Sequence, residues 1–195
     1  MFHPHFTRLV AIGLLFAAPA AAHDLVEEAT LIVELMNLRP GMHVADVGAG
    51  NGEFSEEIAH RLGGAGHVYV NEIDDGELIK LRKRIEKTEL TNMSLVVGET
   101  DDTRLPEACC DAILLRFVYH HMSNRNDMRS NLRRSLRPGG LLVVVEKEER
   151  GDGVPSDSLI ADMITTGFEV VSRHPEWGGH DDHYGIVFRR LAKPE

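Results

Sequence analysis

The feature that most constrains the fold is the alternation of short apolar runs with segments of helical period. Strand-like apolar runs occupy residues 43–47, 67–71, 94–97, 112–117 and 141–146. Segments with a hydrophobic period of 3.6 separate most of them, at residues 54–62, 76–87 and 124–136. Strands that alternate with helices form βαβ units, which place helices on both faces of a parallel sheet. We therefore expect a three-layer α/β fold with a mostly parallel sheet.

The two ends of the pattern differ from its middle. Near the N-terminus, Asp24 is placed to cap a helix that runs to about Leu38 and is stopped by Pro40-Gly41. Near the C-terminus, residues 168–172 and 184–189 are strand-like and are joined by a turn-rich segment without a helix. We expect these two strands to form an antiparallel hairpin at the end of the sheet.

Cys109 and Cys110 are the only cysteines of the chain. Adjacent residues hold their Cα atoms closer together than a disulfide ordinarily requires. We expect no disulfide and interpret the pair as small apolar residues that lead into the strand at residue 112.

A glycine-rich turn, Asp46 to Gly52 (DVGAGNG), lies between the first expected strand and a helix. Gly48, Gly50 and Gly52 lack Cβ atoms, so the backbone can turn tightly and approach a ligand. The helix N-terminus that follows offers unpaired N–H groups to that ligand. The turn therefore predicts a cofactor site.

Acidic residues follow the second strand. Glu72 is placed to accept hydrogen bonds from two ribose hydroxyls, and we expect its carboxylate to face a solvent-filled cleft. Asp74 is expected to cap the next helix. An NAD site shares such an acid, but its fingerprint is G-x-G-x-x-G, and the third glycine position of that pattern is occupied by Glu53.

With three further segments, these residues resemble the class I S-adenosylmethionine-dependent methyltransferase family along nearly the whole chain after residue 23. The further segments are Gly98-Glu99-Thr100, Cys110 to Arg116, and Leu136 to Gly140. The resemblance implies S-adenosylmethionine as cofactor and a Rossmann-like sandwich with a seven-stranded sheet in the order 3-2-1-4-5-7-6. It also implies a set of cofactor contacts: Asp46, Gly48, Gly50, Gly52, Glu72, Glu99, Thr100 and Arg116. Glu99 departs from the Asp that is more usual at its position.

Catalysis by methyl transfer requires mainly that the acceptor atom lies in line with the methyl group. A base, where one is needed, belongs at the carboxyl ends of the fourth and fifth strands, beside Tyr119, His120, His121 and Glu146. The similar family often carries a His-His element there, which implies His120 as the base or as a substrate contact.

Two histidine-rich segments raise the question of a metal ion. Neither residues 120–121 nor residues 180–183 show H-E-x-x-H or another spacing that brings ligands together. We expect no metal site, and we expect residues 180–183 to form a solvated hairpin tip.

Charge and length limit the partners. The 21 basic and 31 acidic residues give a net charge of −10, which repels nucleic acid and anionic membranes. No added domain for docking a macromolecule is evident, so we expect a small-molecule acceptor. Two alternatives stay open: a binding protein that retains the nucleoside site without turnover, and an NAD-dependent oxidoreductase, which the glycine spacing disfavours.

The first residues are typical of a secretory signal peptide. Arg8 precedes the apolar run Leu9 to Ala18, and Pro19 is followed by three alanines that suit a signal peptidase. We expect a signal peptide at residues 1–22 and a methyltransferase domain at residues 23–195. The mature protein would then be exported, to a bacterial periplasm or the medium, and would be cytoplasmic only if the segment is not a signal. The apolar run is too short for stable membrane insertion after cleavage.

Overall fold

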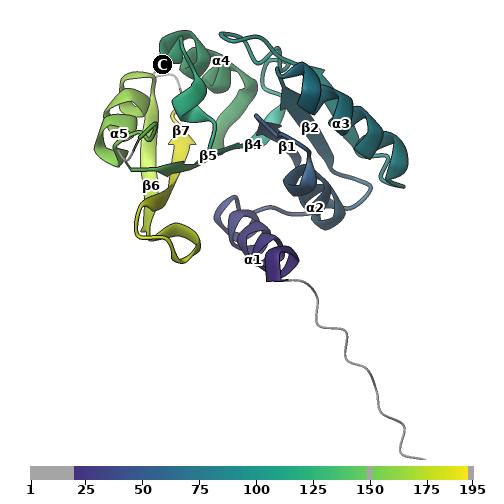
Figure 1. Ribbon diagram of the computed structural model, residues 1–195. Helices are drawn as coiled ribbons and strands as arrows, with labels where there is room; N and C mark the ends of the chain where they lie inside the picture. Colours follow the sequence, from purple (N-terminus) through teal and green to yellow (C-terminus); the bar gives the residue numbers. More distant parts are fainter. Residues whose placement is uncertain (1–19, 149–150, 193–195) are drawn as a thin grey trace, which may run out of the picture.

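The sheet at the centre of the molecule has seven strands in the order β3-β2-β1-β4-β5-β7-β6, as expected (Figure 1). The computed structural model describes residues 20–148 and 151–192, so the predicted signal segment lies almost entirely outside the described residues. The strands are β1 (His43–Val47), β2 (His67–Glu72), β3 (Met93–Val97), β4 (Cys110–Arg116), β5 (Leu136–Lys147), β6 (Phe168–Pro175) and β7 (His183–Arg190). The first five pair in parallel, and β7 lies antiparallel between β5 and β6. The predicted terminal hairpin is therefore confirmed.

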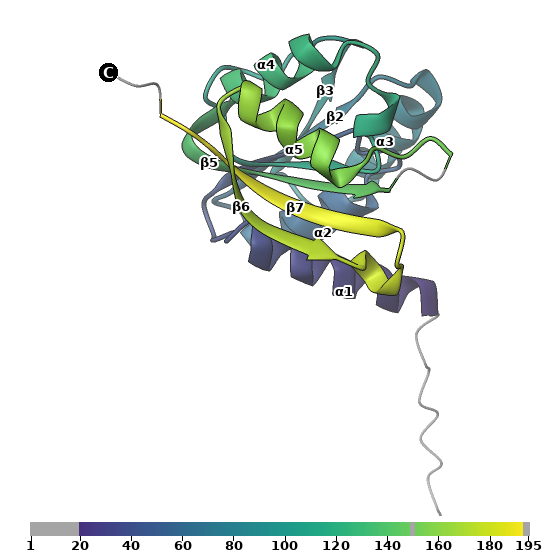
Figure 2. The same ribbon diagram turned by 90° about the vertical axis from the view of Figure 1, so that its left-hand side faces the viewer.

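Helices cover both faces of the sheet. They are α1 (Ala20–Leu35), α2 (Glu53–Leu62), α3 (Asp75–Lys87), α4 (Arg125–Ser135) and α5 (Ser156–Thr165), with 3-10 turns η1 (Tyr119–His121) and η2 (Trp177–Gly179). Side chains of β4 alternate between the faces, because successive residues of a strand point to opposite sides. Ile113 and Leu115 belong to the core under α4 and α5, whereas Ala112 and Leu114 belong to the core under α1 and α2. Figure 2 shows α5 and α1 on opposite sides of the sheet.

Two helix starts test the capping predictions. Asp74 caps α3, since its Oδ1 accepts a hydrogen bond from the Glu77 N–H at 3.0 Å, as predicted. The prediction for Asp24 is wrong, because α1 already begins at Ala20 and Asp24 lies inside the helix. Alanine has the highest helix propensity, so the alanines before Asp24 extend the helix in the full chain.

The expectation for the cysteines is also wrong. The sulfur atoms of Cys109 and Cys110 are 2.26 Å apart and form a disulfide between adjacent residues, with Cα atoms 3.7 Å apart. The backbone there is irregular: Ala108 has a φ of 48°, and the pairing of β4 with β5 shifts register between Cys110 and Ala112. The sequence interpretation assumes a regular start of the strand, so it does not include this local irregularity.

The parallel strands have their carboxyl ends on one side of the molecule. Two segments that are distant in the sequence, α1 and the connection between β6 and β7, meet there. Figure 1 shows α1 and the connection between β6 and β7 close to each other below the sheet. The Trp177 indole N–H donates a hydrogen bond to Glu28 Oε1 at 2.7 Å, which joins these two segments. Within the described residues, no helix is long and apolar enough to cross a membrane.

Candidate functional site

The glycine turn between β1 and α2 has three glycines with positive φ: 73° at Gly48, 55° at Gly50 and 79° at Gly52. A Cβ atom at Gly48 would lie 2.4 Å from Val118, and one at Gly52 would lie 2.5 Å from Leu81, so packing requires both glycines. A Cβ atom at Gly50 would meet nothing within 4 Å. Gly50 therefore presents open space to a ligand, and with Gly48, Ala49 and Asn51 it lines a cavity of about 490 Å³, the turn cavity.

Asp46, the first residue of this turn, is buried. Its side chain is 2% exposed, and its Oδ2 accepts a hydrogen bond from the Ser55 hydroxyl at 2.6 Å. Burial raises the pKa of Asp46 to about 6, although the Ser55 hydrogen bond and the positive charge of Arg116 act in the opposite direction. Asp46 thus ties β1 to α2, and it is not among the residues that line the turn cavity.

The Glu72 carboxylate accepts hydrogen bonds from backbone N–H groups around it. Its Oε2 accepts a hydrogen bond from the Gly50 N–H at 2.8 Å, and its Oε1 accepts two, from Ile73 at 2.7 Å and Asp74 at 3.1 Å. The residue is 8% exposed, so the expected solvent-facing carboxylate is instead largely buried. An ionised carboxylate has about four acceptor positions. One position, on Oε2, stays available to a ligand hydroxyl.

A further cavity, which we call the methionine cavity, lies between Glu72 and η1. Val118, Met122 and Met128 form its apolar wall, and Glu99 and Thr100 line another side. The Glu99 side chain is about half exposed and forms an ion pair with Arg104. The structure thus brings Gly48, Glu72, Glu99 and Thr100 around one cavity, and their contact with the cofactor stays a prediction.

Arg116 forms the wall between the turn cavity and a third cavity. Its Nε lies 3.0 Å from Glu28 Oε1 and its Nη2 lies 2.8 Å from Glu28 Oε2. The guanidinium group also lies 4.3 Å from the centre of the Phe54 ring, a cation–π arrangement. The sequence indicated Arg116 but not Glu28, because no pattern in α1 shows which of its residues faces β4.

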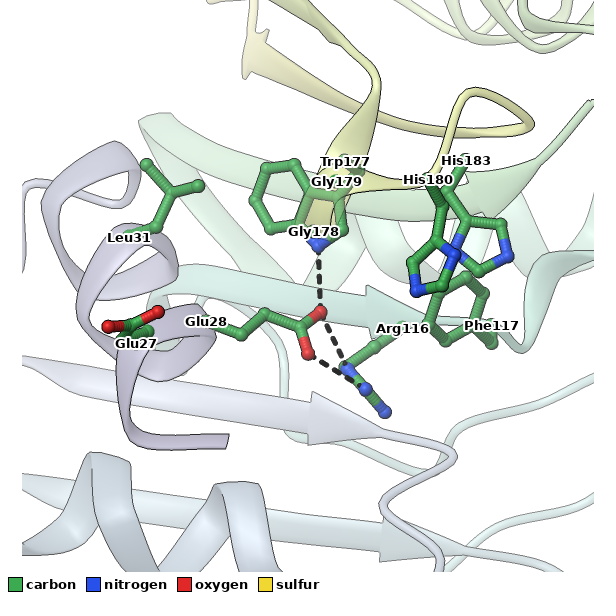
Figure 3. Close-up of a pocket in the computed structure, with 10 residues that line it drawn as sticks. All are labelled: Glu27, Glu28, Leu31, Arg116, Phe117, Trp177, Gly178, Gly179, His180 and His183. Atoms are coloured by element: carbon green, nitrogen blue, oxygen red, sulfur yellow. Dashed lines mark hydrogen bonds and ion pairs between the residues drawn. The ribbon is translucent and has the colours of Figure 1, made fainter. Parts of the chain in front are cut away.

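The third cavity, the hairpin cavity, has a volume of about 520 Å³ and lies between α1, the end of β4 and the connection from β6 to β7 (Figure 3). Leu31, Phe117 and Trp177 supply apolar surface. Polar groups come from Glu27, Glu28, Arg116, His180 and His183. Trp177 is 3% exposed, so its ring is packed into the protein and also forms part of the cavity wall.

His120 does not line any of these three cavities, whereas its neighbour His121 lines the methionine cavity. Its ring is 4% exposed, and its Nδ1 lies 2.8 Å from Oε2 of the fully buried Glu146. Its Nε2 lies 3.5 Å from Asp152 Oδ2. A role for His120 as base stays a prediction, and His180 and His183 are the imidazoles that line the hairpin cavity.

The expectation that residues 180–183 cannot bring ligand atoms together is wrong. Ligand atoms of His180, Asp182 and His183 all lie within 4.8 Å of one another. The turn between η2 and β7 folds these side chains onto one side, which their spacing in the sequence did not reveal.

The residues present fit S-adenosylmethionine. A buried carboxylate with a spare acceptor position suits a ribose hydroxyl, and the methionine-lined wall suits an adenine ring. The glycine turn gives close access to backbone, and Glu28 and Arg116 beside it offer charges of both signs to an amino-acid group. Both cavities are lined in part by Gly48, so they are neighbours.

Known proteins resemble this chain in sequence and in fold. A family model described as "Methyltransferase domain" matches residues 45–144. The ubiquinone/menaquinone biosynthesis C-methyltransferase UbiE of Bordetella avium is 32% identical over 110 residues, which are 56% of this chain and 43% of that protein. The chain thus spans about half the length of such curated relatives.

Solved structures share the fold. A SAM-dependent methyltransferase from Aquifex aeolicus superposes with a TM-score of 0.76 at 22% identity, covering 89% of this chain and 94% of that one. The [4+2]-cyclase SpnF gives the same TM-score of 0.76 at 15% identity, covering 86% and 81%. The fold alone therefore does not fix the reaction, whereas the family match extends over half of the chain and includes the glycine turn, Glu72 and β4. This chain belongs to the class I S-adenosylmethionine-dependent methyltransferase family, whose cofactor is S-adenosylmethionine.

Proposed function

We propose that the protein transfers a methyl group from S-adenosylmethionine to a small molecule bound in the hairpin cavity. The observation that carries the proposal is the shared wall: Glu28 and Arg116 line both the turn cavity and the hairpin cavity. A donor bound along the glycine turn and an acceptor in the hairpin cavity are then neighbours. Placing two reactants in contact supplies most of what methyl transfer needs from a protein.

When bound, S-adenosylmethionine supplies an electrophilic methyl group. The chain's own residues position the acceptor: Phe117 and Trp177 give flat apolar surfaces, and Arg116 provides a fixed positive charge. His180 and His183 line the same cavity and offer polar groups to the acceptor. Aromatic surfaces suit a planar acceptor, and the name of the Bordetella avium relative, a C-methyltransferase of quinone biosynthesis, supports testing phenols and quinols first.

The test is turnover against a panel of small acceptors, measured as formation of S-adenosylhomocysteine together with the methylated product. Leu31 lines the hairpin cavity and is 37% exposed, so Leu31→Trp should fill the cavity without disturbing the core. We expect this variant to raise the acceptor KM at least tenfold and to leave the affinity for S-adenosylmethionine unchanged.

The matched control is Val26→Trp, a change on α1 at a residue that is 46% exposed and does not line the hairpin cavity. It should leave both constants unchanged. Binding of S-adenosylmethionine without turnover of any acceptor would favour the alternative, a binding protein. Equal effects of the two variants would show that the acceptor does not bind in the hairpin cavity.

We also propose that residues 1–22 are a cleaved signal peptide and that the mature protein is exported. The support is the apolar run and the alanines that follow Pro19.

A further inference from the structure

The connection between η2 and β7 carries a cluster of metal-ligand side chains at the mouth of the hairpin cavity. His180 and His183 have ring centres 4.7 Å apart, and His183 Nε2 lies 3.8 Å from Asp182 Oδ1. Ligand atoms on a tetrahedral zinc ion are about 3.3 Å apart, as follows from Zn–N bonds of about 2.0 Å. The separations here, all within 4.8 Å, are within reach of small side-chain rotations.

The backbone holds the cluster in place from two directions. The His183 N–H donates to the His180 carbonyl at 3.3 Å, which closes a reverse turn and sets the two imidazoles side by side. The Glu148 N–H donates to the Asp182 carbonyl at 2.8 Å, which ties the turn to the end of β5. The His183 ring also packs against Phe117, with ring centres 4.9 Å apart. A fixed turn lowers the entropy lost when the three side chains bind one ion.

We propose that His180, Asp182 and His183 bind one divalent transition-metal ion, for which Zn²⁺ is the best match. Two imidazoles, which are borderline donors, together with one carboxylate form a ligand set that suits Zn²⁺ and leaves a tetrahedral ion one open position. His180 and His183 line the hairpin cavity and lie close together near Phe117 in Figure 3, so an ion held by them would be within reach of a molecule in the cavity. The net charge of −10 also favours cation binding.

The open position identifies a ligand class. A hydroxyl, thiol or carboxylate group of a molecule in the hairpin cavity is the ligand that would complete the coordination. This second step rests on the proposed function, because it places the methyl acceptor in that cavity. Metal binding itself does not depend on methyl transfer and is measured without it.

The test is equilibrium dialysis of the full chain, free of any affinity tag, against Zn²⁺, with the bound metal counted by elemental analysis. We expect one tight equivalent in the wild type and a dissociation constant at least tenfold higher in His180→Ala, Asp182→Asn and His183→Ala. The matched control is His60→Ala, which removes an exposed histidine of α2 and should retain the tight equivalent. Far-ultraviolet circular dichroism verifies that each variant is folded.

Cobalt gives an independent readout, since Co²⁺ in a tetrahedral site absorbs visible light far more strongly than octahedral Co²⁺ in water. The wild type and His60→Ala should show this absorption, and His183→Ala should not. The proposal is overturned if the wild type takes up no tight equivalent, or if the three cluster variants bind metal as the wild type does. Either result leaves the turnover test of the proposed function unaffected.

Discussion

Glu28 and Arg116 are 88 residues apart in the sequence, and their side chains form a two-point ion pair across the wall between the turn cavity and the hairpin cavity. Glu28 Oε1 also accepts the Trp177 N–H, so one carboxylate connects α1, β4 and the terminal hairpin. Hydrogen bonds to charged groups are stronger than neutral ones, and the pair is only partly exposed. Glu28 therefore fixes the arrangement of three elements around the site.

Replacing this carboxylate should cost stability. We expect Glu28→Gln to lower the free energy of unfolding by about 1 to 2 kcal/mol, because it loses the ion pair with Arg116 and weakens the contact with Trp177. Chemical denaturation measures the change. Glu34→Gln is the control, since Glu34 is an exposed acid of the same helix, and it should change stability by less than about 0.5 kcal/mol. Equal losses in the two variants would contradict the connecting role of Glu28.

Asp46 should make the stability depend on pH. Its pKa in the folded protein is raised to about 6 from 3.8, so the folded state holds the proton over a range in which the unfolded chain releases it. The stability that comes from this is fully present below about pH 4 and is lost as the pH rises through about 6. At about 1.4 kcal/mol per pH unit, the loss is about 3 kcal/mol.

Asp46→Asn removes this titration and retains an oxygen for the Ser55 hydroxyl. Its free energy of unfolding should match the wild type near pH 4 and exceed it by about 3 kcal/mol at pH 7. Denaturation at a series of pH values provides the measurement. A constant difference between pH 4 and pH 7 would show that Asp46 titrates normally in the folded protein.

Variants of Glu72 and Asp74 should distinguish ligand binding from capping of α3. Glu72→Ala should weaken S-adenosylmethionine binding by about ten- to a hundred-fold, because a ribose hydroxyl loses its hydrogen bond to the carboxylate. It should also lower the free energy of unfolding by about 1 to 3 kcal/mol, because three backbone N–H groups lose their acceptor. Asp74→Ala should lower stability by about 1 kcal/mol, since it removes the cap of α3, and should leave affinity unchanged. Calorimetric titration that showed the reverse order of affinities would move the ribose contact away from Glu72.

The N-terminal segment gives a prediction that is independent of the fold. If residues 1–22 are a signal peptide, protein isolated from its native source begins at His23. N-terminal sequencing decides the point. Recovery of the intact segment in a soluble cytoplasmic fraction would contradict both cleavage and export.

Local patterns predicted most of the fold, because strands, helices and the terminal hairpin each carry their own hydrophobic period. The sheet order was implied by the family resemblance. The prediction that Asp74 caps a helix followed from its residue type. Contacts between distant segments were not predictable in this way. The partnership of Glu28 with Arg116 and Trp177 depends on how α1 packs against the sheet, and the convergence of His180, Asp182 and His183 depends on a turn conformation. Glu72 is buried because backbone N–H groups donate hydrogen bonds to its carboxylate, and the sequence does not show where these groups lie.

The most direct test of the central claim is calorimetric titration of the protein with S-adenosylmethionine, alongside two matched glycine variants. Gly50 and Gly139 both have positive φ, and a Cβ atom at either would meet nothing within 4 Å, so valine should cause comparable backbone strain at both positions. Gly50 lines the turn cavity, whereas Gly139 lies in the exposed turn of β5 and does not line it. We predict one binding site in the wild type and in Gly139→Val, and at least a hundredfold weaker binding in a folded Gly50→Val. Unchanged affinity in Gly50→Val, or no binding by the wild type, would contradict the account.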